Sequence, residues 1–251
     1  MLELASETPG RMSLPYEAIH ASVLVQPFWA VYWVACVLVA IGSGFAFGKL
    51  RNTRKAFHAA SSVATMPAII SGNRSQLSVC LACALPALVL VETFRAARLP
   101  PIGGYIADAA KRFEDKRDNG PFIFSHFALL FGIAAPVWLA ELGNLNPLAA
   151  SAGAIAVGAG DTAAACVGKQ FGRTNIPGTE KTLEGTLAFI LASLLALVSS
   201  LFASGAPPVQ SLLSWRGVRA VAVPAVLEAT VSSGWDNVVV SLYMCAALAH
   251  L

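Results

Sequence analysis

The chain has 251 residues, of which 56% are hydrophobic and only 12% charged, and its mean hydropathy is +0.66. Soluble domains usually carry about a quarter charged residues, so this chain has too little charge to cover a soluble domain, and most of it must face lipid or other helices. The net charge of +3 is small and no block of like charges is present, so no nucleic-acid partner is expected.

Apolar segments that could cross a membrane follow one another from residue 26 to the C-terminus. After an N-terminal segment of residues 1–25, spans are expected at 26–48, 57–71, 77–94, 121–140, 145–165, 183–203, 217–230 and 235–251. The second and the seventh are short, as tilted or re-entrant helices can be. The sequence predicts an all-α polytopic membrane helix bundle of about seven or eight transmembrane helices over residues 26–251.

Positive charge is distributed unevenly between the two sides of this bundle. Four of the 17 Lys and Arg residues lie on the N-terminal side, and the other 13 lie in the connections on the opposite side. Connections rich in Lys and Arg stay in the cytoplasm. The side opposite the N-terminus is therefore predicted to be cytoplasmic.

Unusual polar residues gather at the ends of the spans on this cytoplasmic side. Six segments contribute them, and the residues are His58, Glu92, Asp118, Asp161, Glu228 and the pair Asp236 and Asn237. Polar residues that served only to contact water would be expected at both ends of the spans. A shared site at the cytoplasmic face is therefore predicted.

Asp161 lies within the small-residue segment AVGAGDTAAACVG (156–168). A carboxylate in an apolar helix is costly in lipid, so it must face the interior of the bundle or water. Gly160, Ala164 and Gly168 recur every four residues and allow another helix to approach closely. The alternative to a functional role is a structural carboxylate that caps a helix or pairs with a lysine.

The connection GKQFGRTNIPGTEKTLEGT (168–186) is rich in glycines, hydroxyls and cations. Its glycines allow close backbone approach, and Pro177–Gly178 predicts a turn. Thr182 can cap the following helix and direct backbone N–H groups, with the charge of Lys181, toward an anion such as a nucleotide phosphate. Glu184 opposes this unless a metal or Lys181 offsets its charge. The alternative is an ordinary basic loop beside anionic lipid.

The segment SGWDNVVV places Asp236 and Asn237 at the cytoplasmic end of the last span. Their oxygens suit Mg²⁺, which prefers one or two carboxylates together with substrate phosphates. Together with Asp161, Asp236 would supply the two carboxylates that phosphoryl transfer with a metal ion usually requires. A helix N-cap is the alternative reading of Asp236.

Two further segments carry polar residues with open roles. In FEDKRDNGPFIFSH (113–126), Arg117 and Asp118 begin a turn at the membrane surface, and His126 follows inside the next helix. In RKAFH (54–58) the cations could set topology alone. His126 and His58 could be hydrogen-bonded packing residues instead of site residues.

These segments together resemble the CTP-dependent polyprenol kinases, and among them the dolichol kinases. The resemblance is carried by RKAFH (54–58), LVETFRAARLPPIGGYI (90–106), FEDKRDNGPFIFSHFALLFGIAAPVWL (113–139), GAGDTAAACVGKQFGRTNIPGTEKTLEGTLA (158–188) and LEATVSSGWDNVVVSLY (227–243). The fourth block resembles a superfamily that also includes phytol kinase, CTP-dependent diacylglycerol kinase and, more distantly, phosphatidate cytidylyltransferase. The third points to the dolichol kinases.

The resemblance implies a multi-pass enzyme of the endoplasmic-reticulum membrane. It would move the γ-phosphate of CTP to the terminal hydroxyl of dolichol at the cytoplasmic face, with a divalent cation (Mg²⁺ or Ca²⁺), and so supply the lipid carrier of protein glycosylation. Its partners would be CTP, the polyprenol and membrane lipid. A kinase of another lipid alcohol (phytol or diacylglycerol) stays open, as does a transporter, which would place its polar residues near mid-span.

The resemblance also implies which residues act. The CTP-binding region falls on Asp161 and on Gly168, Gly172, Arg173, Pro177, Gly178, Thr179, Lys181, Thr182, Glu184 and Gly185. Asp161 and Asp236 are expected to hold the metal, or one of them to act as base. Further polar candidates are His58, Glu92, Arg117, Asp118, His126, Glu228 and Asn237. Glu180 stands where the family usually has a lysine.

Overall fold

The computed structural model describes residues 27–46, 53–111, 120–204, 209–231 and 234–251, and these residues are largely helical. In chain order the elements are α2 (Pro27–Ala46), α3 (Thr53–Ile70), α4 (Arg74–Ala96), α5 (Gly103–Ala110), α6 (Phe124–Leu142), α7 (Pro147–Gly153), the π-helix η1 (Ala154–Asp161), α8 (Thr162–Phe171), α9 (Leu183–Ser204), the 3₁₀-helix η2 (Val209–Leu213), α10 (Trp215–Thr230) and α11 (Asp236–Leu248). Within these ranges there is no β-strand, only an isolated bridge between Asn175 and Thr182. The all-α prediction is confirmed for this part of the chain.

Four helical stretches are long and apolar enough to cross a membrane. They are α4, α6, the continuous run Pro147–Phe171 that α7, η1 and α8 form together, and α9, while α11 is apolar but shorter. Large apolar side chains on these helices face outward, such as Leu90 on α4 and Leu195 on α9. Such surfaces are stable against lipid or another protein but not in water. The chain is thus a helical membrane protein.

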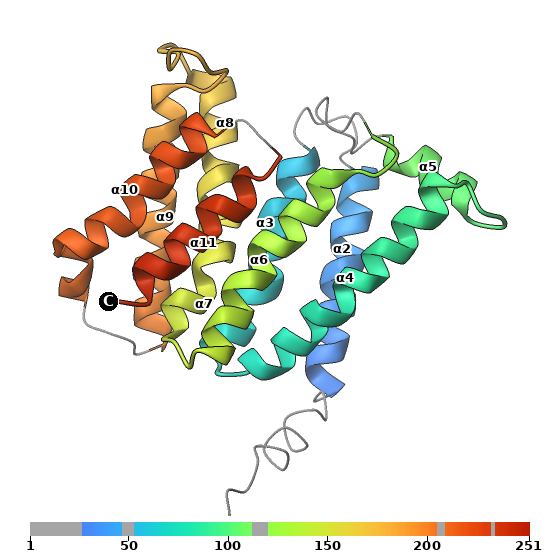
Figure 1. Ribbon diagram of the computed structural model, residues 1–251, viewed down its shortest axis with the longest axis horizontal. Coiled ribbons are helices and arrows are strands. Elements are labelled where there is room, and N and C mark those ends of the chain that lie inside the picture. Colours follow the sequence, from blue (N-terminus) through green and yellow to red (C-terminus); the bar gives the residue numbers. More distant parts are fainter. Residues whose placement is uncertain (1–26, 47–52, 112–119, 205–208, 232–233) are drawn as a thin grey trace, which may run out of the picture.

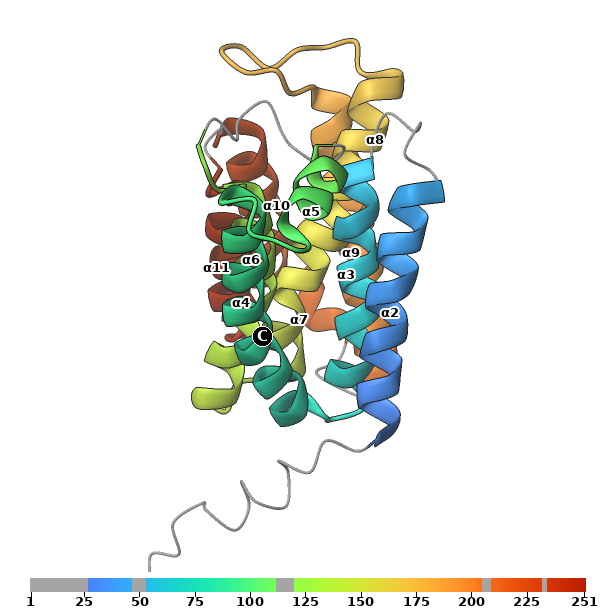
Figure 2. The same cartoon turned by 90° about the vertical axis from the view of Figure 1, so that its right-hand side faces the viewer.

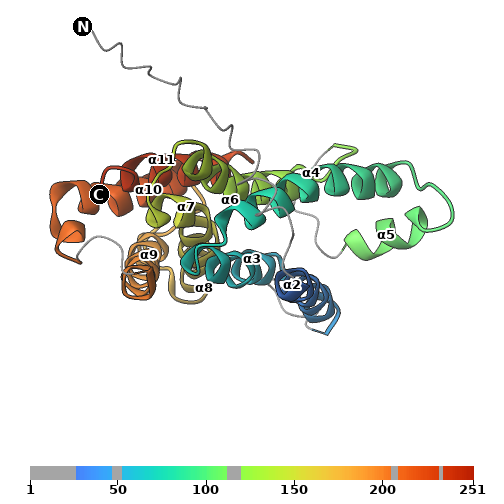
Figure 3. The ribbon, with the colours of Figure 1, turned by 90° about the horizontal axis from the view of Figure 1, so that it is seen from below.

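The long helices stand side by side, as Figures 1 and 2 show from two directions. Seen from below in Figure 3, they form two rows, with α2, α3, α8 and α9 in one row and α4, α6, α11 and α10 in the other. α7 packs against α6 and α11 of the second row and also contacts α3 and α9 of the first, and so joins the rows. The connection between α8 and α9 and the first turns of α3 and α6 lie at one end of the bundle, at the top of Figure 1. The chain therefore brings its polar connections to one end.

Small residues allow the central run Pro147–Phe171 to pack closely on its neighbours. A Cβ atom added to Gly153 would lie 2.4 Å from the carbonyl oxygen of Gly132, and one added to Gly160 would lie 2.7 Å from the ring of Phe189. Gly168 continues this contact surface, since its Cβ would lie 3.6 Å from the Cα of Gly185 on α9. The predicted small-residue contact surface is confirmed, and the helix that packs against Gly160 and Gly168 is α9.

Each predicted span corresponds to a helix, with shifts of a few residues at the ends. The main differences are that the central run continues to Phe171, beyond the predicted end at residue 165, and that α5 forms within a segment predicted as a connection. Arg117 and Asp118 lie outside the described residues, so the turn predicted there is not described.

Candidate active site

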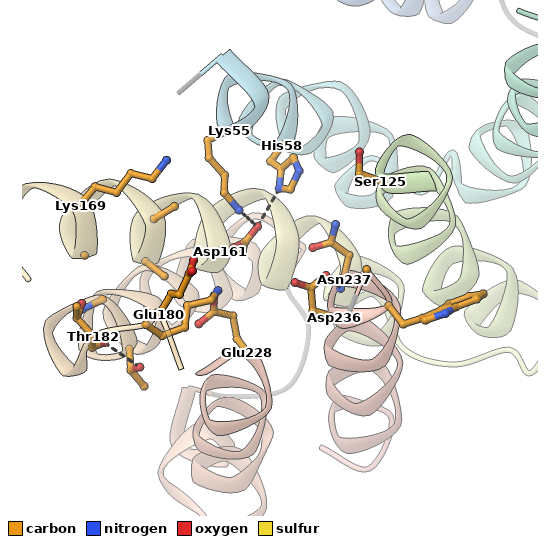
Figure 4. Close-up of a pocket in the computed structure, with 18 of the residues that line it drawn as sticks. Lys55, His58, Ser125, Asp161, Lys169, Glu180, Thr182, Glu228, Asp236 and Asn237 are labelled. Atoms are coloured by element: carbon orange, nitrogen blue, oxygen red, sulfur yellow. Dashed lines mark hydrogen bonds and ion pairs between the residues drawn. The ribbon is translucent and has the colours of Figure 1, made fainter. Parts of the chain in front are cut away.

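Asp161 ends the π-helix η1 and is buried in the bundle, with 8% of its surface exposed. Its Oδ2 accepts hydrogen bonds from the ammonium of Lys55 and from Nδ1 of His58, at 2.9 Å for the histidine. Both partners come from α3 and point toward the carboxylate in Figure 4. A buried carboxylate needs such partners to remain charged in the interior.

Local helix geometry explains how α3 supplies both partners. Lys55 and His58 are three residues apart, so they lie on the same face of the helix. On the facing segment, a Cβ atom added to Gly158 would lie 1.4 Å from the hydroxyl oxygen of Ser62, so only a glycine allows α3 this close to η1. The π-helical turns shift the register of η1 relative to an α-helix, as such segments often do at functional sites.

A second ion pair lies near the first. The ammonium of Lys181, from the connection before α9, donates to Oε1 of Glu228 on α10. Glu228 is 5% exposed, whereas the Lys181 side chain is partly exposed. This pair ties the α8–α9 connection to α10 and leaves one side of the lysine open to solvent.

Both ion pairs line a single cavity of about 440 Å³ at the polar end of the bundle (Figure 4). Its charged and polar lining includes Lys55, His58, Ser125, Asp161, Lys169, Glu180, Lys181, Thr182, Thr186, Glu228, Asp236 and Asn237. Gly168, Gly185 and Trp235 complete part of its wall. The side chains come from α3, α6, η1, α8, α9, α10, α11 and the connection before α9. Segments distributed along the chain from Lys55 to Asn237 thus converge on one polar cavity.

The structure brings nine of the predicted site residues to this cavity. They are His58, Asp161, Gly168, Lys181, Thr182, Gly185, Glu228, Asp236 and Asn237. The remaining predicted residues that the structure describes do not line it, namely Glu92, His126, Gly172, Arg173, Pro177, Gly178, Thr179 and Glu184. Six of these eight belong to the α8–α9 connection or to the first turn of α9.

The α8–α9 connection folds back on itself instead of wrapping over the cavity. Leu183 N donates to the carbonyl of Thr174 at 2.9 Å, and Ile176 N donates to that of Lys181 at 2.9 Å. Gly178 sits at the tip with φ +78°, as the predicted turn requires. The fold-back keeps Arg173, Pro177 and Thr179 away from the cavity wall.

Thr182 caps α9 as predicted, since its hydroxyl oxygen accepts a hydrogen bond from Gly185 N at 3.2 Å. Two of the N–H groups at this helix start are already bonded, because Leu183 N donates to the Thr174 carbonyl and Gly185 N donates to the cap. The Glu184 carboxylate accepts from Thr174 N at 3.2 Å, so it stabilises the connection. The lysines of the cavity, more than this helix start, offer positive charge to an anion.

Glu92 and His126 lie away from the polar cavity. Glu92 is buried and accepts from Arg95 at 2.8 and 2.6 Å and from the backbone N–H of Ile123. It thereby anchors the segment that leads into α6, whose first turn carries Ser125 into the cavity. His126 lines a second, apolar cavity beside the polar one.

Sequence reasoning missed Lys55, Ser125 and Lys169 as site residues. A usable signal existed for Lys55, because it precedes the candidate His58 by one helical turn in RKAFH. Ser125 directly precedes the candidate His126, but of the two only Ser125 lines the polar cavity. Nothing in the sequence distinguishes Lys169 from the other cations of its connection.

The cavity offers the kinds of oxygen atom that bind divalent cations, but their arrangement only partly suits such an ion. Asp161, Asp236 and Asn237 offer carboxylate and amide oxygens. Asp161, however, is bonded to Lys55 and His58, and among the described residues no group of three or more His, Cys, Asp or Glu is placed to hold a metal alone. The cavity therefore fits a cation that shares its ligands with a phosphate-bearing substrate, as Mg²⁺ usually does.

Comparison with known proteins identifies relatives by sequence. No family model and no solved structure matches the chain. The dolichol kinase of Bos taurus is 32% identical over 204 residues, 78% of this chain and 37% of the relative. The dolichol kinase of Saccharomyces cerevisiae is 33% identical over 196 residues (78% and 36%), and that of Schizosaccharomyces pombe 28% over 242 residues (90% and 47%). The chain thus spans less than half the length of these relatives.

Proposed function

Because the chain belongs to the dolichol kinase family, we propose that it transfers the γ-phosphate of CTP to the terminal hydroxyl of dolichol, the lipid carrier of protein glycosylation. The hydroxyl oxygen bonds to the γ-phosphorus, the bond from that phosphorus to the β,γ-bridging oxygen breaks, and CDP leaves. The hydroxyl proton passes to a carboxylate of the site, for which Asp161 and Asp236 are the candidates. The observation that carries this proposal is the cavity in which these carboxylates meet three lysines.

Phosphoryl transfer is catalysed mainly by positioning the reactants and neutralising charge. Lys55, Lys169 and Lys181 line the cavity and supply positive charge for the CTP phosphates. Lys181 would exchange Glu228 for a phosphate oxygen when CTP enters. Glu228 would then lose its ion pair with Lys181, and its unpaired negative charge would favour a cation in the same cavity.

We propose that a divalent cation, Mg²⁺ or Ca²⁺, is held by Asp161 and Asp236, with the Asn237 amide beside them. Once bound, the cation supplies charge neutralisation at the phosphate oxygens. Lys55 and His58 fix the orientation of the Asp161 carboxylate through the hydrogen bonds described above. Asp236, at the first turn of α11, faces the same cavity from the opposite row of helices.

The proposed setting is the endoplasmic-reticulum membrane, with seven or eight crossings and the cavity at the cytoplasmic face. Supporting this, the described cations around the cavity include Lys55, Lys169 and Lys181, whereas Arg74 and Arg216 lie at the helix ends on the other side. A positively charged face is expected to remain cytoplasmic.

The direct test offers CTP labelled in its γ-phosphate to membranes that contain the chain, with dolichol, phytol and diacylglycerol as separate acceptors. We expect labelled dolichyl phosphate, lost in the Asp161→Asn variant at equal protein level. Label in phytol or diacylglycerol instead would assign the cavity to another lipid alcohol. No label in any acceptor would refute a lipid kinase function for this part of the family.

A further inference from the structure

A second cavity, of about 670 Å³, lies beside the polar one, between α2, α3, α4 and α6. Its walls are largely apolar and include Leu81 and Leu88 of α4 and Leu129, Leu130 and Ile133 of α6. α2 packs on α3 and α4 packs on α6 (Figure 3), and both helix pairs contribute residues to the cavity wall. α4 and α6 are candidate membrane spans, so these walls would lie at the depth of the lipid tails.

The two hydroxyls that α3 contributes to its wall are bonded within that helix. The Ser61 hydroxyl donates to the carbonyl of His58 at 2.6 Å, and the Thr65 hydroxyl donates to that of Ser61 at 2.8 Å. Backbone carbonyls thus take up the donors of these side chains and leave mostly hydrocarbon facing the cavity. Its lining suits a hydrocarbon chain and offers little to a polar ligand.

The apolar cavity meets the polar one at two residues. His58 and Ser125 line both. His58 also bonds to Asp161 at 2.9 Å, so the apolar cavity begins one hydrogen bond away from the carboxylate of the site. From this end the walls run along α3 from Phe57 to Thr65 and along α6 from Ser125 to Ile133, about 12 Å at 1.5 Å per residue.

We propose that this apolar cavity holds the first isoprene units of the lipid alcohol, with the hydroxyl between His58 and Ser125 and the rest of the tail extending into the bilayer. The proposal rests on the proposed function for its choice of ligand and adds where that ligand binds. A hydrocarbon tail could enter between α2 and α4 from the membrane without crossing water. Its hydroxyl would then meet the phosphate donor at the shared wall.

Ala84 and Ala87 of α4 provide a matched test. Ala84 lines the apolar cavity and is partly buried, whereas Ala87 is exposed on the same helix and does not line it. Ala84→Phe should raise the KM for a long-chain polyprenol at least tenfold, with a smaller effect on an alcohol of one or two isoprene units. Ala87→Phe should leave both values near those of the unmodified chain. Equal KM values for Ala84→Phe and Ala87→Phe with the long-chain alcohol would overturn the proposal.

A binding measurement separates this proposal from the proposed reaction. A polyprenol with a photoreactive diazirine in its second isoprene unit is cross-linked to the full chain in bilayers, and the labelled peptides are mapped. We expect labels on α4 and α6 residues of the apolar cavity. Ala84→Phe should reduce this labelling and Ala87→Phe should not, whether or not CTP is the phosphate donor of the chain. Labels confined to the outer lipid-facing surface, or unaffected by Ala84→Phe, would refute the tail site even if kinase activity is found.

Discussion

Substitutions of the paired residues Asp161 and Lys55, singly and together, can separate an effect on stability from an effect on catalysis. Both residues are buried, 8% and 7% exposed, and they come from elements far apart in sequence. Removing one partner of a buried ion pair costs about 3–5 kcal/mol, because the remaining charge is left uncompensated. Lys55→Met and Asp161→Asn should therefore each lower the thermal unfolding temperature in detergent. The effect should be larger in Lys55→Met, since the amide introduced by Asp161→Asn could still accept a hydrogen bond.

The double variant Lys55→Met/Asp161→Asn removes both charges, so we expect it to regain much of the lost stability. Its phosphate transfer from CTP should stay reduced by about 10²-fold or more, the effect of removing one preorganised electrostatic group from a site. Unfolding temperature and transfer rate are measured on the same preparations. A stable double variant with near-normal transfer would show that the pair only supports the fold, and would refute the catalytic assignment of Asp161.

Three further predictions follow from the cavity and its surroundings. Lys181→Ala should raise the KM for CTP or lower kcat by about ten- to a hundredfold, the effect of losing one charged hydrogen bond to phosphate. Glu180→Lys should instead lower the KM for CTP. CTP titrations that are unchanged in both variants would remove Lys181 from the phosphate site. Gly153→Ala should destabilise the bundle by about 1–3 kcal/mol because its Cβ meets backbone atoms, whereas Gly104→Ala, whose Cβ meets nothing within 4 Å, should not; equal unfolding temperatures would contradict the close packing. Single cysteines at Gly104 and Thr174, in a chain whose own cysteines are replaced, should react with an impermeant reagent from the cytoplasmic side only, and reaction from the lumen would overturn the orientation.

The helices can be predicted from the sequence because apolar length and charged connections are local properties. The central run is evident from its hydropathy, and the contact of Gly160 with α9 is consistent with its small-residue spacing. The convergence of polar residues follows from the alternation of spans, which places every second connection at the same end. This argument alone groups Asp161, Glu228 and Asp236, which the structure places in one cavity.

The partners within the site could not be predicted because they depend on packing between distant segments. Lys55 and Asp161 are 106 residues apart, and Lys181 and Glu228 are 47 apart. The fold-back of the α8–α9 connection, which keeps Arg173 and Thr179 out of the cavity, depends on backbone hydrogen bonds that no motif specifies. Glycine and proline predict a turn there but not the direction in which it faces.

The central claim, transfer of the γ-phosphate of CTP to dolichol in this cavity, is tested most directly by following the α- and γ-phosphates of CTP separately. CTP labelled separately in its α- and γ-phosphates is incubated with the chain and dolichol in bilayers, and the lipid product is isolated. The account predicts γ-label in the lipid and α-label only in CDP and remaining CTP, with the γ-transfer abolished by Asp161→Asn. Appearance of α-label in the lipid would show nucleotidyl transfer, and γ-label in the lipid that is unaffected by Asp161→Asn would place the chemistry outside this cavity; either result would contradict the account.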